Sequence, residues 1–198
     1  NDKATSENIS YEEAIENHQK DYINPSNIIL MVNPSAKREQ SPDSNFSSFH
    51  HSNINDRHLR FLTMKTSTFW RNLYGSYVTD LFSDVVESVM DNLISAVKDD
   101  NKKDYRKQSY KKLIEQLEIL SQDSKEEKLN IYVCGALSKS KRKDFIFFIE
   151  ELIEEISENS DLNIELSFYA VYHPGYQNLK KLIQGGCEKI VKHSMKVE

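Results

Sequence analysis

Four short apolar runs, each ended by polar or turn-forming residues, most constrain what this chain can fold into. They cover residues 27–32, 77–82, 129–135 and 164–172. Runs of this length between breakers are typical of strands that are buried on both faces of a sheet. Segments with apolar residues at helical spacing separate them. The alternation predicts an α/β fold in three layers, with a four-stranded, mainly parallel central sheet.

The segments between the apolar runs carry the helical signals. Helices are predicted over residues 84–97, 110–120, 145–156 and 176–184, with one or two helical turns at 68–74. A first helix is predicted over 11–21, with Ser10 as its N-cap and Glu13 as the capping-box partner. Residues 187–192 form a further candidate strand. At 198 residues, the chain fits an N-terminal arm and helix (1–26) followed by one domain (27–198).

Charged residues on the helical segments are predicted to face solvent. The mixed charges of 98–112 indicate a solvated helix face. An acidic outer face is predicted for the 145–156 helix and continues to residue 158. Its members are Glu150, Glu151, Glu154, Glu155 and Glu158.

Charge and cysteine content exclude several classes of protein. The net charge of -5 disfavours a globally basic DNA binder but leaves room for a local basic surface. Two distant cysteines, Cys134 and Cys187, make neither a disulfide scaffold nor a four-cysteine zinc or iron–sulfur site. No apolar run approaches the length of a membrane span. A cytoplasmic protein without a cofactor and without membrane contact is therefore expected.

A short group of potential metal ligands lies in the polar stretch 35–65. It contains His50, His51, Asp56 and His58. Their spacing matches no helix or hairpin ligand pattern, although these residue types do bind metals. No metal site is therefore predicted.

Polar clusters follow the apolar runs at the points where the predicted strands end. They are 33–35, Thr79-Asp80, 135–138 and 173–176. Ligands of open α/β sheets bind outside the carboxyl ends of the strands. All four clusters are therefore expected to meet at one ligand-binding mouth.

Two of these clusters, in their order, resemble motifs of the uracil-DNA glycosylase superfamily. Residues 28–34 resemble its first motif, a strand running into an Asx-Pro turn, and 171–176 resemble its second, a strand running into His-Pro and a wedge loop. Phe69-Trp70 and 77–80 resemble a helix and a base-reading strand of the mismatch-specific uracil and thymine glycosylases. Residues 75–80 are also similar to bacterial members. The resemblance spans residues 27–182 and implies the fold of that superfamily.

The resemblance implies roles for four residues in hydrolysis of an N-glycosidic bond. Asn33 would position water, and His173 would donate a hydrogen bond to the leaving base. An amide orients water but cannot take its proton, so slow catalysis is expected. Phe46, 13 positions after Asn33, would stack on a flipped base. Ser35 stands where some members carry a tyrosine that excludes 5-methyl pyrimidines.

Structural roles remain open for three of the same residues. Asn33 is also suited to capping the turn before Pro34, and His173 to closing a strand with its hydrogen bonds satisfied. Phe46 is equally suited to anchoring a loop on the core, and Phe49 and Phe61 compete with it as the stacking residue.

Asp80 departs from the asparagine that most uracil-reading members carry at the matching position. An ionised carboxylate only accepts hydrogen bonds, whereas uracil presents an acceptor beside its N3–H donor. The adjacent N1–H and N2–H₂ donors of guanine suit Asp80 better. The alternative is that Asp80 caps a helix that begins near Ser83.

The remaining predicted contacts are with the nucleic-acid backbone and the base stack. Phosphate is expected to bind to the basic residues after the third strand, which are Lys139, Lys141, Arg142 and Lys143. The alternative is a solvated basic turn. Tyr176 and Gln177 replace the usual apolar wedge, which favours single-stranded nucleic acid, a free nucleobase or a nucleotide over duplex. The sequence also leaves open a catalytically inactive module that senses a nucleotide or binds a protein partner. It does not indicate an oligomeric state.

Overall fold

The computed structural model describes residues 24–32, 59, 61–63, 69–85, 87, 89–123, 128–159, 162, 164–174 and 178–190. The predicted helix at 11–21 and the histidine-rich group at 50–58 lie outside these residues. So do five of the predicted site residues. They are Asn33, Ser35, Phe46, Tyr176 and Gln177.

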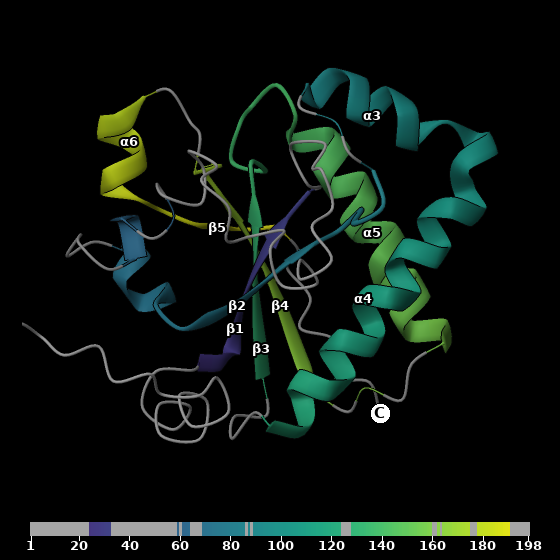
Figure 1. The fold of residues 1–198 in the computed structure, drawn as a ribbon, viewed down its shortest axis with the longest axis horizontal. Helices are drawn as coiled ribbons and strands as arrows, with labels where there is room; N and C mark the ends of the chain where they lie inside the picture. The colour runs from purple at the N-terminus through teal and green to yellow at the C-terminus, as the bar shows by residue number, and fades with distance from the viewer. Residues whose placement is uncertain are drawn as a thin grey trace, which may run out of the picture.

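A five-stranded sheet in the order β2-β1-β3-β4-β5 forms the centre of the molecule (Figure 1). Its strands are β1 (Asn24–Met31), β2 (Ser76–Asp80), β3 (Lys128–Cys134), β4 (Glu165–Val171) and β5 (Glu188–Lys189). The first four run parallel, and β5 is antiparallel to β4. The α/β class and the mainly parallel sheet are thus confirmed.

The prediction of four strands is wrong because the chain returns to β4 after the last helix. Gly185 and Gly186 adopt positive φ angles of 66° and 140°, which other residues rarely do. This turn brings Glu188 into register with Ala170, and the Ile190 N–H bonds to the Phe168 carbonyl at 2.9 Å. This two-residue edge strand falls within the candidate strand at 187–192, so that part of the prediction is confirmed.

Helices lie on both faces of the sheet (Figure 1). The helices α4 (Lys103–Asp123) and α5 (Arg142–Asn159) cover one face, and α3 (Met90–Lys98) packs beside α4. The short helix η3 (Asp100–Lys102) joins α3 to α4. The other face carries two short helices, η2 (Phe69–Leu73) and α6 (Leu179–Gln184).

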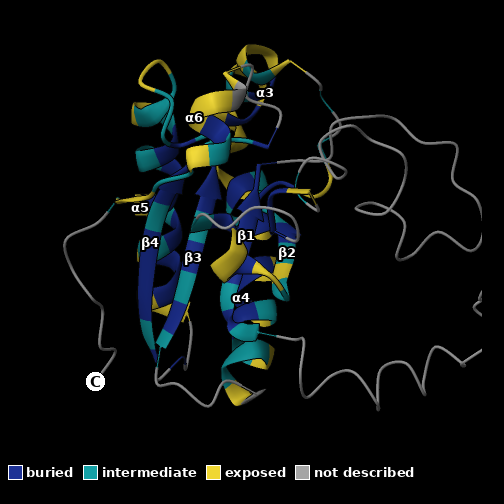
Figure 2. Ribbon diagram, turned by 90° about the vertical axis from the view of Figure 1, so that its left-hand side faces the viewer, coloured by how far each residue is buried: buried dark blue, intermediate teal, exposed yellow. Residues whose placement is uncertain are grey.

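Side-chain alternation along the strands divides the core between these two helical layers. Ile28 and Leu30 of β1 belong to the larger apolar cluster, which includes the buried side chains of α4 and α5. Ile29 and Met31 point to the opposite face, where they join a smaller cluster around Trp70. The three inner strands, β1, β3 and β4, are accordingly largely buried (Figure 2).

A buried hydrogen bond fixes the smaller layer. The Trp70 indole N–H donates to the Leu182 carbonyl at 2.6 Å, which joins η2 to α6. Both residues are buried, so the bond satisfies two groups that would otherwise lose their water partners.

Helix α3 begins later than the periodicity from residue 84 predicts. The N–H groups of Leu81 and Phe82 still bond to the carbonyls of Met31 and Val32, at 2.9 and 2.8 Å. The chain therefore continues beside β1 beyond Asp80, and α3 starts only at Met90.

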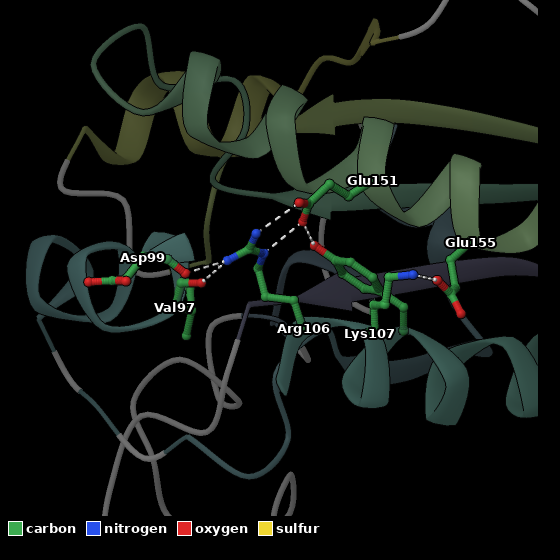
Figure 3. Close-up of polar contacts among 7 residues, drawn as sticks. Val97, Asp99, Arg106, Lys107, Glu151 and Glu155 are labelled. Atoms are coloured by element: carbon green, nitrogen blue, oxygen red, sulfur yellow. Dashed lines mark hydrogen bonds and ion pairs between the residues drawn. The ribbon is translucent and has the colours of Figure 1, made fainter. Parts of the chain in front are cut away.

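The predicted solvated faces of α4 and α5 are partly wrong, because ion pairs lie between the two helices (Figure 3). Arg106 is only 2% exposed and Glu155 only 4%. The Arg106 guanidinium donates to both carboxylate oxygens of Glu151, at 2.7 and 2.8 Å. Its third nitrogen, Nη1, donates to the carbonyls of Val97 and Asp99, at 2.8 and 2.9 Å.

Glu151 is the acceptor at the centre of this network. The Tyr110 hydroxyl donates to its Oε2 at 3.0 Å, in addition to the bonds from Arg106. Burial opposes ionisation of Glu151, but the bonds from Arg106 and Tyr110 outweigh it and lower the pKa of this carboxyl. The network fixes α4 to α5 and to the end of α3.

Candidate ligand site at the carboxyl edge of the sheet

The carboxyl ends of the four parallel strands lie at one edge of the sheet, here called the carboxyl edge. Register pairs Met31 with Asp80 and Cys134 with Val171, while Leu30 pairs with Val133. The direction in which the chain adds strands reverses between β1 and β3. From β1 the chain first adds β2 on one side of it, and then adds β3 on the other side. Loops diverge at such a switch point and leave room for a ligand. The carboxyl edge is therefore the candidate site.

Asp80 ends β2 at this edge. Val78 packs with the smaller cluster, so Asp80, two residues further, points to the same face of the sheet. Burial raises the pKa of the Cys134 thiol, and the negative charge of Asp80 raises it further. Asp80 thus acts electrostatically on the end of β3. The alternative role as a helix cap near Ser83 is wrong, because α3 begins at Met90.

The Thr79 side chain contacts helix α4 and is not a candidate ligand contact. Its hydroxyl donates to the Gln116 side-chain oxygen of α4 at 2.7 Å, and the residue is buried. The bond fixes β2 to the α4 layer. Of the predicted Thr79-Asp80 cluster, Asp80 remains as the candidate ligand contact.

Gly135 lets the loop after β3 pack closely at the carboxyl edge. Its φ of 93° lies in a region that residues with a side chain rarely adopt. A Cβ atom there would lie 3.3 Å from the Phe145 ring and 3.9 Å from the His173 Cβ. The Gly135 N–H also bonds to the Val171 carbonyl at 2.9 Å. These contacts hold the end of β3 against the end of β4.

His173 follows β4 by two residues and is partly buried beside Gly135. Burial lowers its pKa from 6.5 to about 4. The imidazole is therefore neutral at neutral pH, with one nitrogen that donates a hydrogen bond and one that accepts. His173 is therefore a candidate neutral donor at the carboxyl edge.

Asp80 and His173 flank the switch point. Their strands, β2 and β4, are separated by β1 and β3. Three strand spacings of about 4.8 Å place the two backbone ends roughly 14 Å apart. The two side chains are therefore candidates for opposite ends of one ligand rather than for contact with each other.

The predicted phosphate contacts lie in the loop between β3 and α5 and at the start of α5. Lys139 and Lys143 are exposed and form no ion pair within the described part of the chain. Lys141 pairs with Asp91 of α3, and Arg142 pairs with Glu188 of β5. Two of the four cations therefore already have carboxylate partners.

Two residue sets at or near this edge escaped the sequence reasoning. Arg106 could have been found, because Arg106, Tyr110, Leu113 and Leu117 fall on one helical stripe that is otherwise apolar. Asp91 and Glu188 give no such signal. They are 50 and 46 residues from the cations that they contact.

The described residues contain no group of three or more histidine, cysteine or acidic side chains that could hold a metal ion. Within the same residues, no helix has the length and apolar character needed to cross a membrane. Comparisons with protein-family models, curated proteins and solved structures give no match.

Proposed function

We propose that the carboxyl edge binds a nucleobase, and that the chain slowly hydrolyses the N-glycosidic bond of a non-standard base in single-stranded nucleic acid. The observation that carries the proposal is the position of His173, which is partly buried beside Gly135 at the ends of β3 and β4. The motif resemblance at 28–34 and 171–176 supports it.

The chemistry of glycosidic cleavage suits a neutral imidazole. The base leaves as an anion whose charge spreads over its ring nitrogens and carbonyl oxygens, while the sugar passes through an oxocarbenium-like state. A hydrogen bond donated by neutral His173 stabilises the charge that develops on the base. Asn33, two positions after the last residue of β1 in the sequence, would orient the attacking water. The amide of Asn33 takes no proton, so turnover is slow.

The carboxylate of Asp80 indicates which base edge the site prefers. Adjacent N–H donors, as on guanine, would each meet an acceptor oxygen of Asp80. The O4 atom of uracil would face that carboxylate with a repulsive pair of acceptors. The distance between the β2 and β4 ends leaves room for a base between the two side chains.

A second candidate is a catalytically inactive module that senses a nucleotide or binds a protein partner. The pairing of Lys141 with Asp91 and of Arg142 with Glu188 favours it, because those cations are already neutralised. The net charge of -5 acts in the same direction.

An abasic-site assay separates these candidates. Oligonucleotides carrying uracil, hypoxanthine, xanthine or mismatched thymine, single- and double-stranded, would be incubated with the wild type, Asn33→Ala and His173→Ala. Asn101→Ala is the matched control, because Asn101 is exposed in η3.

Strand cleavage after alkali should be greater for single strands than for duplex. It should fall by about 100- to 1000-fold in His173→Ala, as when an oxyanion donor is lost. Saturable binding without cleavage would favour the inactive module. If the protein neither binds nor cleaves any of these substrates, the proposal is overturned.

A further inference from the structure

We infer that Asp91 and Glu188 are internal counter-ions that compete with a phosphate group for Lys141 and Arg142, and so lower the affinity of the carboxyl edge for phosphate. The inference rests on the proposed function for the location of the phosphate. It deepens that proposal by naming what regulates the site.

Two features of the ion pairs point to competition. Lys141 and Arg142 are adjacent in the chain, yet their partners come from two distant elements, α3 and β5. The carboxylates are the more exposed members, at 73% for Asp91 and 56% for Glu188. Exposed pairs of this kind contribute little to stability. An arriving phosphate can therefore replace them without unfolding the surrounding elements.

The position of Asp91 is set by contacts at the other end of α3. Lys98, the last residue of α3, donates to Asp144 in the first turn of α5 at 2.7 Å. Arg106 holds the carbonyls of Val97 and Asp99 from the buried side. These bonds anchor α3 independently of Asp91, so the Asp91–Lys141 pair can open while the helix stays in place.

Exchange of carboxylate for phosphate has a measurable signature in salt dependence. A cation that contacts the phosphate of a single strand normally steepens the slope of log K against log salt by about 0.7, because a counterion is released. A cation that is paired internally also frees a carboxylate of this chain, which attracts a cation from solution and partly offsets that release. The wild-type slope should therefore be shallower than that of a variant without the carboxylate.

The first test measures binding of a dye-labelled single-stranded oligonucleotide by fluorescence anisotropy across a salt series. Asp91→Asn and Glu188→Gln are compared with Glu150→Gln, which removes the same charge from an exposed position of α5. Each test variant should bind about 1.5- to 5-fold more tightly than the control, the range expected from the strength of an exposed ion pair. Each should also steepen the salt slope, by at most about 0.7.

The second test measures pyrophosphate binding. The NMR shifts of the Lys141 and Arg142 backbone amides report it during the titration. Tighter pyrophosphate binding in Asp91→Asn and Glu188→Gln than in Glu150→Gln supports the inference, even if no protein binds the oligonucleotide and the proposed function fails. Equal affinities of all variants for both probes overturn the inference. Any oligonucleotide binding by the wild type would then still support the proposed function. Absence of any response to either probe overturns both.

Discussion

Acidification should destabilise this protein through His173. The pKa of this side chain is 6.5 in an open environment and about 4 in the folded chain, because burial disfavours its charged form. Between these two values the unfolded chain binds more protons than the folded one. Stability is therefore fully present above about pH 6.5 and is lost as the pH falls towards 4.

The magnitude follows from the two pKa values of His173. At about 1.36 kcal/mol per pH unit, the difference between 6.5 and about 4 corresponds to at most about 3.4 kcal/mol. Between pH 7 and pH 4.5 the expected loss is about 2.4 kcal/mol. That is a large fraction of the stability of a typical domain, which is about 5–15 kcal/mol.

Urea unfolding of the wild type and of His173→Gln at pH 7 and pH 4.5 measures this loss. Glutamine does not titrate, so the variant should lose about 2.4 kcal/mol less than the wild type over this interval. Carboxylates such as Glu151 titrate in both proteins, and their contribution cancels in the comparison. An NMR titration of the His173 ring should give a midpoint near pH 4.

Two results would refute the reasoning about His173. One is equal loss of stability in the wild type and His173→Gln between pH 7 and pH 4.5. The other is a ring midpoint near pH 6.5, which would mean that the imidazole is solvated and is not the buried neutral donor of the carboxyl edge.

Three further substitutions test other parts of the account. Arg106→Met should lower the free energy of unfolding by about 3–5 kcal/mol, because Glu151 stays partly buried without its partner; urea unfolding should show a much smaller loss for Lys111→Met, which changes an exposed position of α4. Trp70→Phe should cost about 1–3 kcal/mol in the same assay, because the Leu182 carbonyl loses its donor. Asp80→Asn should shift the ratio of uracil to guanine binding by about 1–3 kcal/mol, or one to two decades. A ratio within about twofold of the wild type in a ligand competition would exclude Asp80 as a reader of the base edge.

The strands were predictable because their signal is local. Residues 129–135 predict a buried strand, and β3 covers Lys128–Cys134. Parallel strands have their carboxyl ends at the same edge of the sheet. The pairing of Met31 with Asp80 confirms this arrangement for β1 and β2. The start of α3 was not predictable in this way, because the bonds of Leu81 and Phe82 to β1 outweigh the helical periodicity from residue 84.

Charge pairing was the part of the site that the sequence could not reveal. Basic residues at 139–143 predict a phosphate contact, but their neutralisation depends on Asp91 and Glu188, which reach the loop only through the folded chain. Glu151 and Glu155 were likewise assigned to solvent, because an acidic helix face gives no sign of the cation that packs against it. Pairing between distant elements depends on tertiary packing, which propensity and periodicity do not encode.

The most direct test of the central claim is a map of the ligand footprint on the isotope-labelled protein. A single-stranded oligonucleotide carrying one non-standard base would be titrated while the backbone amide shifts are followed. The account predicts saturable shifts at the carboxyl edge, at Asp80, Gly135 and His173, with none at the opposite edge, where Ser76 and Lys128 begin their strands. Shifts confined to the opposite edge or to the outer faces of the helices would contradict it.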